Sequence, residues 1–127
     1  ENSASAGISN EESQILDEFA IESLEKLETI EVNLIQLEEN PDDLEIIDAI
    51  FRPFHTIKGV SGFLNLMDIN KLAHSVESLL DKSRSGEITI NEAIVDIVLE
   101  SVDLLTGMLL EVKIVSDSAP IIPRWKC

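Results

Sequence analysis

The chain has 127 residues, of which 25 are Asp or Glu and nine are Lys or Arg, for a net charge of −16. This acidity argues against nucleic acid and anionic membranes as partners, because both are themselves negatively charged and attract basic surfaces. The length suits one domain, no apolar run approaches the roughly 20 residues of a membrane span, and the single cysteine, Cys127, cannot form an internal disulfide. We therefore expect a cytoplasmic protein.

The charge is unevenly distributed along the chain. Residues 1–51 contain fifteen acidic residues and one basic residue, whereas residues 52–86 contain three acidic and five basic residues. Both histidines, His55 and His74, lie in the basic segment. A locally basic face on an acidic protein suits a phosphate group or an acidic partner. Solubility alone explains the acidity of residues 1–51 equally well.

The first half of the chain predicts two helices. Residues 1–8 are small and polar, and we expect them to be mobile. A capping box, Ser9-x-x-Glu12, then begins a helix over residues 10–39, in which apolar residues recur every three or four positions. Asn40 and Pro41 are typical of a break and a new helix start, which predicts a second helix over residues 42–66. Pro53 should bend or loosen that helix just before His55.

The second half predicts two more helices and a tail. Asp68 is the expected cap of a helix over residues 69–85, and the capping box Thr89-x-x-Glu92 opens a helix over residues 90–115. The last helix is apolar on two sides, so we expect deep burial. Residues 116–127 contain two prolines and should form an irregular tail or linker. Together, the four amphipathic helices predict an all-α, antiparallel up-down four-helix bundle over residues 9–115. This shape alone indicates no function.

His55 lies on the water-facing side of the second predicted helix. On a helical wheel it is roughly 140° from the mean direction of the apolar residues, and Lys58, Gly59 and Gly62 lie within roughly 60° of it. Glycine inside a helix costs up to about 1 kcal/mol relative to alanine. We therefore interpret the two glycines on this exposed face as clearance for another molecule.

The third predicted helix carries two further polar candidates, His74 and Glu77. Antiparallel packing of the second and third helices allows Glu77, expected on the surface, to approach His55. A carboxylate that accepts a hydrogen bond from one ring nitrogen fixes the tautomer and makes the other nitrogen a better nucleophile. Lys58 can pair with phosphoryl oxygens. This arrangement predicts a histidine that carries a phosphoryl group.

Two other kinds of site use the same region. A metal bound by His55, His74 and Glu77 is disfavoured, because there is no fourth ligand and Lys58 would lie beside the cation. A hydrolytic triad is also disfavoured, because Ser61 falls on the apolar side of its helix and no oxyanion hole is indicated. The chain has no Gly-rich phosphate loop, so we do not expect it to bind ATP by itself.

The run from His55 to Gly59, His-Thr-Ile-Lys-Gly, resembles the His-[Ser/Thr]-[Ile/Leu]-Lys-Gly signature of histidine phosphotransfer (HPt) domains. Residues 61–63 and 74–88 extend the likeness, which covers roughly residues 11–110 and is strongest to the domain at the N-terminus of CheA-type chemotaxis kinases. The resemblance implies that a histidine kinase ATP-binding domain phosphorylates His55. The phosphoryl group then passes to an aspartate of a response-regulator receiver domain. ATP and Mg²⁺ are expected on those partners, and no cofactor or metal is expected on this domain.

The resemblance also implies roles for the neighbouring residues. Lys58, His74 and Glu77 match positions that support the phosphorylated histidine, whereas Gly59 and Gly62 match positions that give partners clearance. Arg52, in the basic segment, is a further expected docking position.

CheA-type domains usually continue into another helix where this chain has residues 116–127, so the parent protein could be a chemotaxis kinase, another hybrid kinase or a stand-alone HPt protein. Whether the domain belongs to an enzyme stays open. The alternative is a non-catalytic helical adaptor that binds a receiver or kinase domain.

Overall fold

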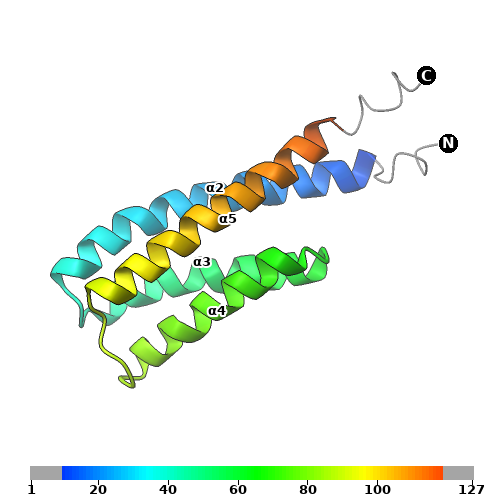
Figure 1. The fold of residues 1–127 in the computed structure, drawn as a ribbon. Coiled ribbons are helices and arrows are strands. Elements are labelled where there is room, and N and C mark those ends of the chain that lie inside the picture. Colours follow the sequence, from blue (N-terminus) through cyan, green and yellow to red (C-terminus); the bar gives the residue numbers. More distant parts are fainter. Residues whose placement is uncertain (1–9, 119–127) are drawn as a thin grey trace.

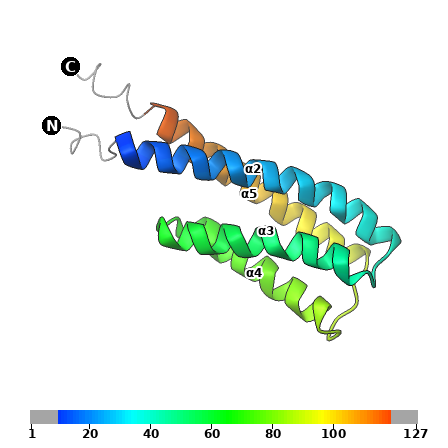
Figure 2. The ribbon, with the colours of Figure 1, turned by 180° about the vertical axis from the view of Figure 1, so that it is seen from behind.

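The computed structural model describes residues 10–118, which form four helices: α2 (Asn10–Glu39), α3 (Leu44–Phe63), α4 (Met67–Arg84) and α5 (Glu92–Ser118). Successive helices run in opposite directions, with α2 beside α5 and α3 beside α4 (Figures 1 and 2). Packing of α2 on α3 and of α4 on α5 closes the bundle. The predicted all-α four-helix bundle is therefore confirmed. No helix within residues 10–118 has the length and apolar character needed to cross a bilayer.

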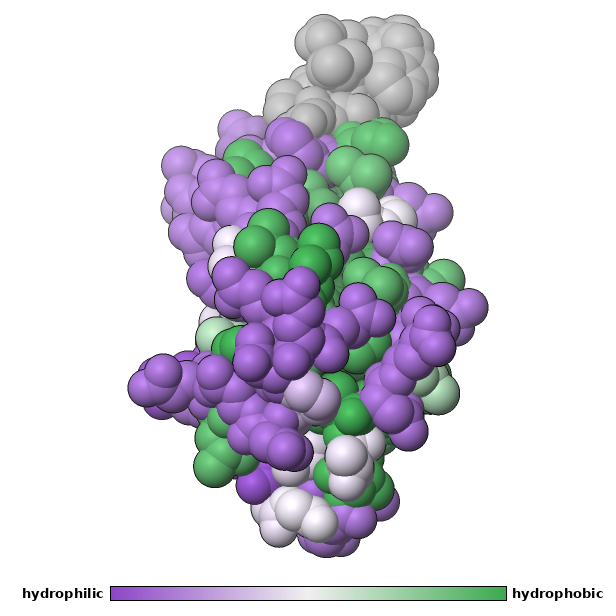
Figure 3. Space-filling model, turned by 90° about the vertical axis from the view of Figure 1, so that its left-hand side faces the viewer, coloured by the Kyte–Doolittle hydropathy of each residue, from purple (hydrophilic) through white to green (hydrophobic). Residues whose placement is uncertain are grey.

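Apolar side chains from all four helices meet in a single core. In α3 the buried positions follow helical spacing, because every third or fourth residue returns to the same face. Burial of these stripes is the main source of stability for such helices. The largest fully buried side chains are Leu27, Ile30, Leu34, Leu37, Ile47, Ile50, Phe54, Ile57, Leu80, Val95, Leu105 and Leu109. The outer surface is mainly hydrophilic, with smaller hydrophobic patches between polar side chains, on the face that Figure 3 shows.

The expectation that the last helix is deeply buried on two sides was wrong. One stripe of α5, including Val98, Val102 and Leu105, is buried, whereas Ile97 and Leu104 are 48% and 60% exposed. The reason is packing from one side: α5 contacts α2 and α4, and its second apolar stripe faces outward.

The predicted caps of α3 and α4 differ from the observed ones. Asp43, rather than Asn40, caps α3, because its carboxylate accepts hydrogen bonds from the backbone N–H groups of Glu45 and Ile46 at 3.0 and 3.4 Å. The helix continues through Pro53 and ends at Phe63, shortly before Asn65 adopts a left-handed φ of 62°. Consequently α4 begins at Met67. Asp68 lies in its first turn, where a negative charge is favourable, and is not the cap.

The ends of α5 also differ from expectation. Asn91, rather than Thr89, caps the helix, since its Oδ1 accepts the N–H of Ile94 at 2.9 Å. At the other end α5 continues to Ser118, so residues 116–118 are helical rather than irregular. The last turns are held on α2 by an ion pair between Lys113 and Asp17, at 3.0 Å. The expectations for residues 1–8, Ser9 and 119–127 lie outside the described residues.

Candidate functional site

His55 projects outward from the middle of α3. Its neighbour Phe54 and, two residues on, Ile57 are both buried in the core, so helical geometry turns the imidazole to the opposite side. The His55 side chain is 62% exposed. The prediction that this histidine faces water is confirmed, and the ring is open to a second macromolecule.

Glu77 reaches His55 from α4. Its Oε2 pairs with Nδ1 of His55, and its Oε1 lies 2.7 Å from Nζ of Lys58. The predicted approach of Glu77 to His55 is thus confirmed. The expectation of a surface position was wrong, because the Glu77 side chain is only 9% exposed. It lies next to buried Val76 in the tight α3–α4 contact, and the two basic side chains of α3 pair with it there.

The carboxylate of Glu77 is ionised at neutral pH. Burial acts to raise its pKa, but hydrogen bonds from Lys58 and then from His55 outweigh burial and lower the pKa below its ordinary value. An ionised carboxylate can only accept hydrogen bonds, so Nδ1 of His55 carries a proton. In the neutral ring, Nε2 then holds the free lone pair. The site therefore presents a nucleophilic nitrogen that is directed away from the buried carboxylate.

Two other residues considered for this region, His74 and Ser61, have no described contact with the His55 ring. His74 is exposed on α4, and the described contacts of His55 do not include it. Ser61 is buried, and its hydroxyl donates to the carbonyl oxygen of Lys58 at 3.1 Å. Within residues 10–118, no three His, Cys, Asp or Glu side chains come together in a group that could hold a metal ion. Neither the metal-site nor the triad hypothesis gains support.

The two glycines of this face have different surroundings. A Cβ atom added at Gly59 would meet nothing within 4 Å, so this position leaves open space one turn from His55. At Gly62 the added atom would lie 3.0 Å from Nδ2 of Asn70, which donates to the Lys58 carbonyl at 2.8 Å. Gly62 therefore allows α4 to approach α3. Asn70 was not evident as a site residue from the sequence, because its contact with α3 depends on the register of the two helices.

A second cluster of polar and aromatic side chains lies beside His55. Arg52, 78% exposed, pairs with Asp48 at 2.9 Å, and Arg84 of α4 pairs with the same carboxylate at 2.8 Å. Arg84 also packs over the ring of Phe51, which is stacked against the His55 imidazole. Sequence reasoning missed Phe51 and Arg84. The four-residue spacing from Phe51 to His55 places the two on one helix face and could have indicated this contact.

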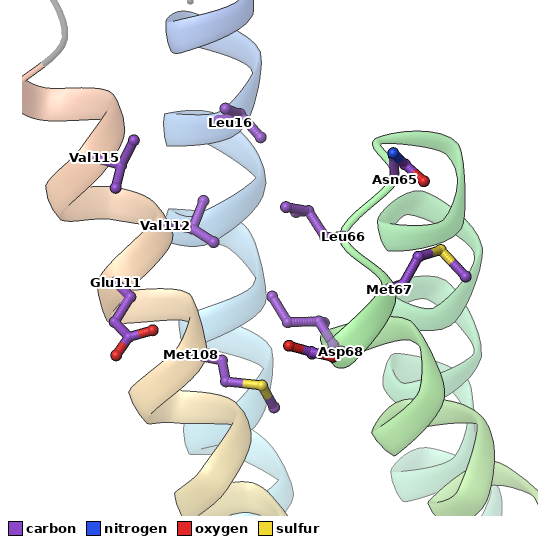
Figure 4. Close-up of a pocket in the computed structure, with 10 residues that line it drawn as sticks. Leu16, Asn65, Leu66, Met67, Asp68, Met108, Glu111, Val112 and Val115 are labelled. Carbon is purple, nitrogen blue, oxygen red and sulfur yellow. The ribbon is translucent and has the colours of Figure 1, made fainter. Parts of the chain in front are cut away.

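A cavity of about 470 Å³ lies elsewhere, at the turn between α3 and α4. Figure 4 shows Leu16 of α2 and Met108 and Val112 of α5 on one side of it, with Leu66 of the turn on the other. Its lining is mostly apolar and includes none of the polar residues around His55. The candidate site around His55 is therefore on the open surface of α3 and does not share this cavity.

A family model, related sequences and solved structures all match the greater part of this chain. The family described as Hpt domain matches residues 14–113. The sensor histidine kinase CheAY of Helicobacter pylori is 43% identical over 100 residues, which are 79% of this chain and 12% of that protein. The chemotaxis protein CheA of Borreliella burgdorferi is 36% identical over 99 residues, 78% of this chain and 12% of that protein. The CheA phosphotransferase domain from Thermotoga maritima superposes with a TM-score of 0.76 at 36% identity, covering 79% of this chain and 95% of that one.

Proposed function

The chain belongs to the Hpt domain family, and from this premise we propose that it is a phosphocarrier of two-component signalling that uses His55. The observation that carries the proposal is the arrangement of His55, Glu77 and Lys58. One ring nitrogen is bound to a buried carboxylate, the ring is exposed, and a lysine lies beside the same carboxylate.

Phosphorylation begins with ATP held by a histidine kinase catalytic domain. The lone pair on Nε2 of His55 forms a bond to the γ-phosphorus while the bond from that phosphorus to the bridging oxygen breaks, and ADP leaves. Nδ1 keeps its proton, so the ring becomes positively charged, and the carboxylate of Glu77 compensates this charge. Lys58 lies within one helical turn of His55, where its ammonium group can pair with phosphoryl oxygens.

The second transfer removes the positive charge that the ring of His55 gained in the first. An aspartate of a response-regulator receiver domain attacks the phosphorus, the P–N bond breaks, and the ring of His55 becomes neutral again. Mg²⁺ belongs to the receiver, so this chain contributes position and electrostatics rather than a cofactor. The open space at Gly59 and the exposed Arg52 beside the site fit the approach of an acidic receiver surface.

The wider setting rests on the relatives. They are named as chemotaxis proteins and as a sensor histidine kinase, but the chain spans only about an eighth of their length. A CheA-type chemotaxis kinase is therefore the parent that we propose, acting in the cytoplasm where ATP is available. A stand-alone Hpt protein and a non-catalytic adaptor are the alternatives.

The test is phosphorylation by a purified histidine kinase core with labelled ATP. We expect acid-labile, base-stable label on the unmodified protein and none on His55→Gln. His74→Gln, which removes the other histidine of the chain, is the matched control and should retain most of the label. Transfer is then followed by adding a receiver domain with Mg²⁺. Undiminished label on His55→Gln would overturn the proposal, and binding without any labelling would support the adaptor.

A further inference from the structure

We propose that Phe51 and Arg84 are positioning residues that fix the plane of the His55 imidazole, so that Nε2 is presented to the incoming phosphoryl group. The inference rests on the proposed function of His55 and adds two residues to it. Neither residue contacts Glu77 or Lys58 in the described hydrogen bonds and ion pairs. Phe51 contacts the ring of His55 directly, and Arg84 acts on that ring through Phe51.

The first observation is the stack between the two rings. The centroids of Phe51 and His55 are 6.0 Å apart and the ring planes differ by 11°. This spacing lies in the range of favourable offset stacking. Glu77 holds the exposed imidazole at one ring atom, Nδ1, and coupled rotation about the Cα–Cβ and Cβ–Cγ bonds of His55 can still change the tilt of the ring. A second flat surface beside the ring limits this tilt.

The second observation is the way in which Arg84 holds Phe51. The guanidinium carbon of Arg84 lies 3.9 Å from the centroid of the Phe51 ring, which is a close cation–π contact. The same guanidinium pairs with Asp48 of α3 at 2.8 Å and with Asp81 of α4 at 2.9 Å. Hydrogen bonds with Asp48 and then Asp81 raise the pKa of Arg84, so the charge is permanent. Two carboxylates thus hold the planar guanidinium of Arg84 in place, and Phe51 packs against a fixed neighbour.

Core packing alone is the competing explanation for Phe51. The ring is half-buried and packs against the core, so an aliphatic side chain could fill the same volume. Core packing requires only a side chain of the right volume at position 51, whereas positioning requires the flat ring of Phe51 and the planar guanidinium of Arg84. Small displacements of a nucleophile reduce the rate of a transfer reaction without weakening the binding of the partner. The positioning role therefore predicts an effect on kcat rather than on KM.

The kinetic experiment compares Phe51→Leu, Phe51→Tyr and Arg84→Lys with the unmodified protein, using the kinase core as the enzyme and this chain as its substrate. We expect Phe51→Leu to lower kcat by about 3- to 10-fold with little change in KM, because one stacked pair is lost. Phe51→Tyr keeps a flat ring, so its kcat should stay close to that of the unmodified protein. Arg84→Lys keeps the positive charge but loses the planar guanidinium, so kcat should fall by about 2- to 5-fold.

A readout without phosphorylation uses NMR of the two histidine rings. We expect Arg84→Lys, which leaves both aromatic rings in place, to shift the ring resonances of His55, while those of His74 stay unchanged. Arg84→Lys, on the exterior of the bundle, keeps the test decisive if Phe51→Leu fails to fold. Unchanged His55 resonances in Arg84→Lys, an effect on KM alone, or equal losses in Phe51→Leu and Phe51→Tyr would each overturn the inference. Absence of label on the unmodified protein would instead overturn the proposed function, and the NMR result would still decide the role of the two residues.

Discussion

Replacing Glu77 with glutamine removes the negative charge from the site while keeping its shape. The amide oxygen can still accept a hydrogen bond from Nδ1 of His55, but the amide nitrogen then faces the ammonium group of Lys58. The fold should survive, with a loss of about 1–2 kcal/mol because a charge-assisted hydrogen bond is lost. The larger effect should fall on phosphorylation, because the positive ring of His55 loses its compensating charge.

The size of that effect follows from the geometry. Two unit charges about 4 Å apart attract by about 4 kcal/mol at an effective dielectric constant of 20. If about half of the ring charge has developed in the transition state, the loss is about 2 kcal/mol, or roughly 30-fold in rate. The His55 ring is 62% exposed, and water screens part of the attraction. We therefore expect Glu77→Gln to slow phosphorylation by about 10- to 30-fold.

The assay measures the rate of labelling by a kinase core at saturating concentrations of this chain, so that docking does not limit the rate. Glu100→Gln is the matched control, since it removes one negative charge from an exposed position on α5. It should be labelled at the rate of the unmodified protein. A folded Glu77→Gln variant with an unreduced rate would refute the electrostatic reasoning, and an equal loss in Glu100→Gln would assign the effect to net charge.

Three further outcomes follow from the same contacts. The pKa of Glu77 is lower in the folded than in the unfolded protein, where it is near 4.5, so its ionised carboxylate stabilises the fold above pH 4.5 and loses this effect as the pH falls through the folded pKa. The melting temperature of Glu77→Gln should therefore depend less on pH below about 4.5 than that of the unmodified protein. Gly59→Ala should raise the free energy of unfolding by about 0.5–1 kcal/mol in urea titrations, whereas Gly62→Ala should not, because its Cβ would crowd Asn70. Leu80→Ala, in the core, should cost about 2–5 kcal/mol in the same titration.

The sequence predicted the four helices well because their apolar spacing reflects the core directly. The helix ends were less predictable. Asn40 and Asp43 are both good caps, and only the path of the turn decides which side chain meets the free N–H groups of α3. The exposure of Leu104 was not predictable from α5 alone, because a helix with two apolar stripes does not reveal how many neighbours it has.

The site was partly predictable for similar reasons. The exposure of His55 follows from the helical period within α3, and its pairing with Glu77 was correctly inferred from antiparallel packing of α3 on α4. The burial of Glu77 was missed, because a wheel gives a direction and not the depth of the contact between two helices. Arg84 was missed for a different reason: two of its partners, Asp48 and Phe51, lie on the other helix, and a wheel of α4 does not show them.

These contacts give α3 and α4 distinct contributions to the chemistry. Helix α3 supplies the proposed nucleophile His55, the cation Lys58 and the open position Gly59, all within about one turn of the helix. Helix α4 supplies Glu77, and the protein stabilises its buried charge with basic groups of α3. A change in the register of the two helices would separate Glu77 from both partners at once. The apolar seam between α3 and α4 is therefore as important to the chemistry of His55 as the polar residues themselves, although it contacts no phosphate.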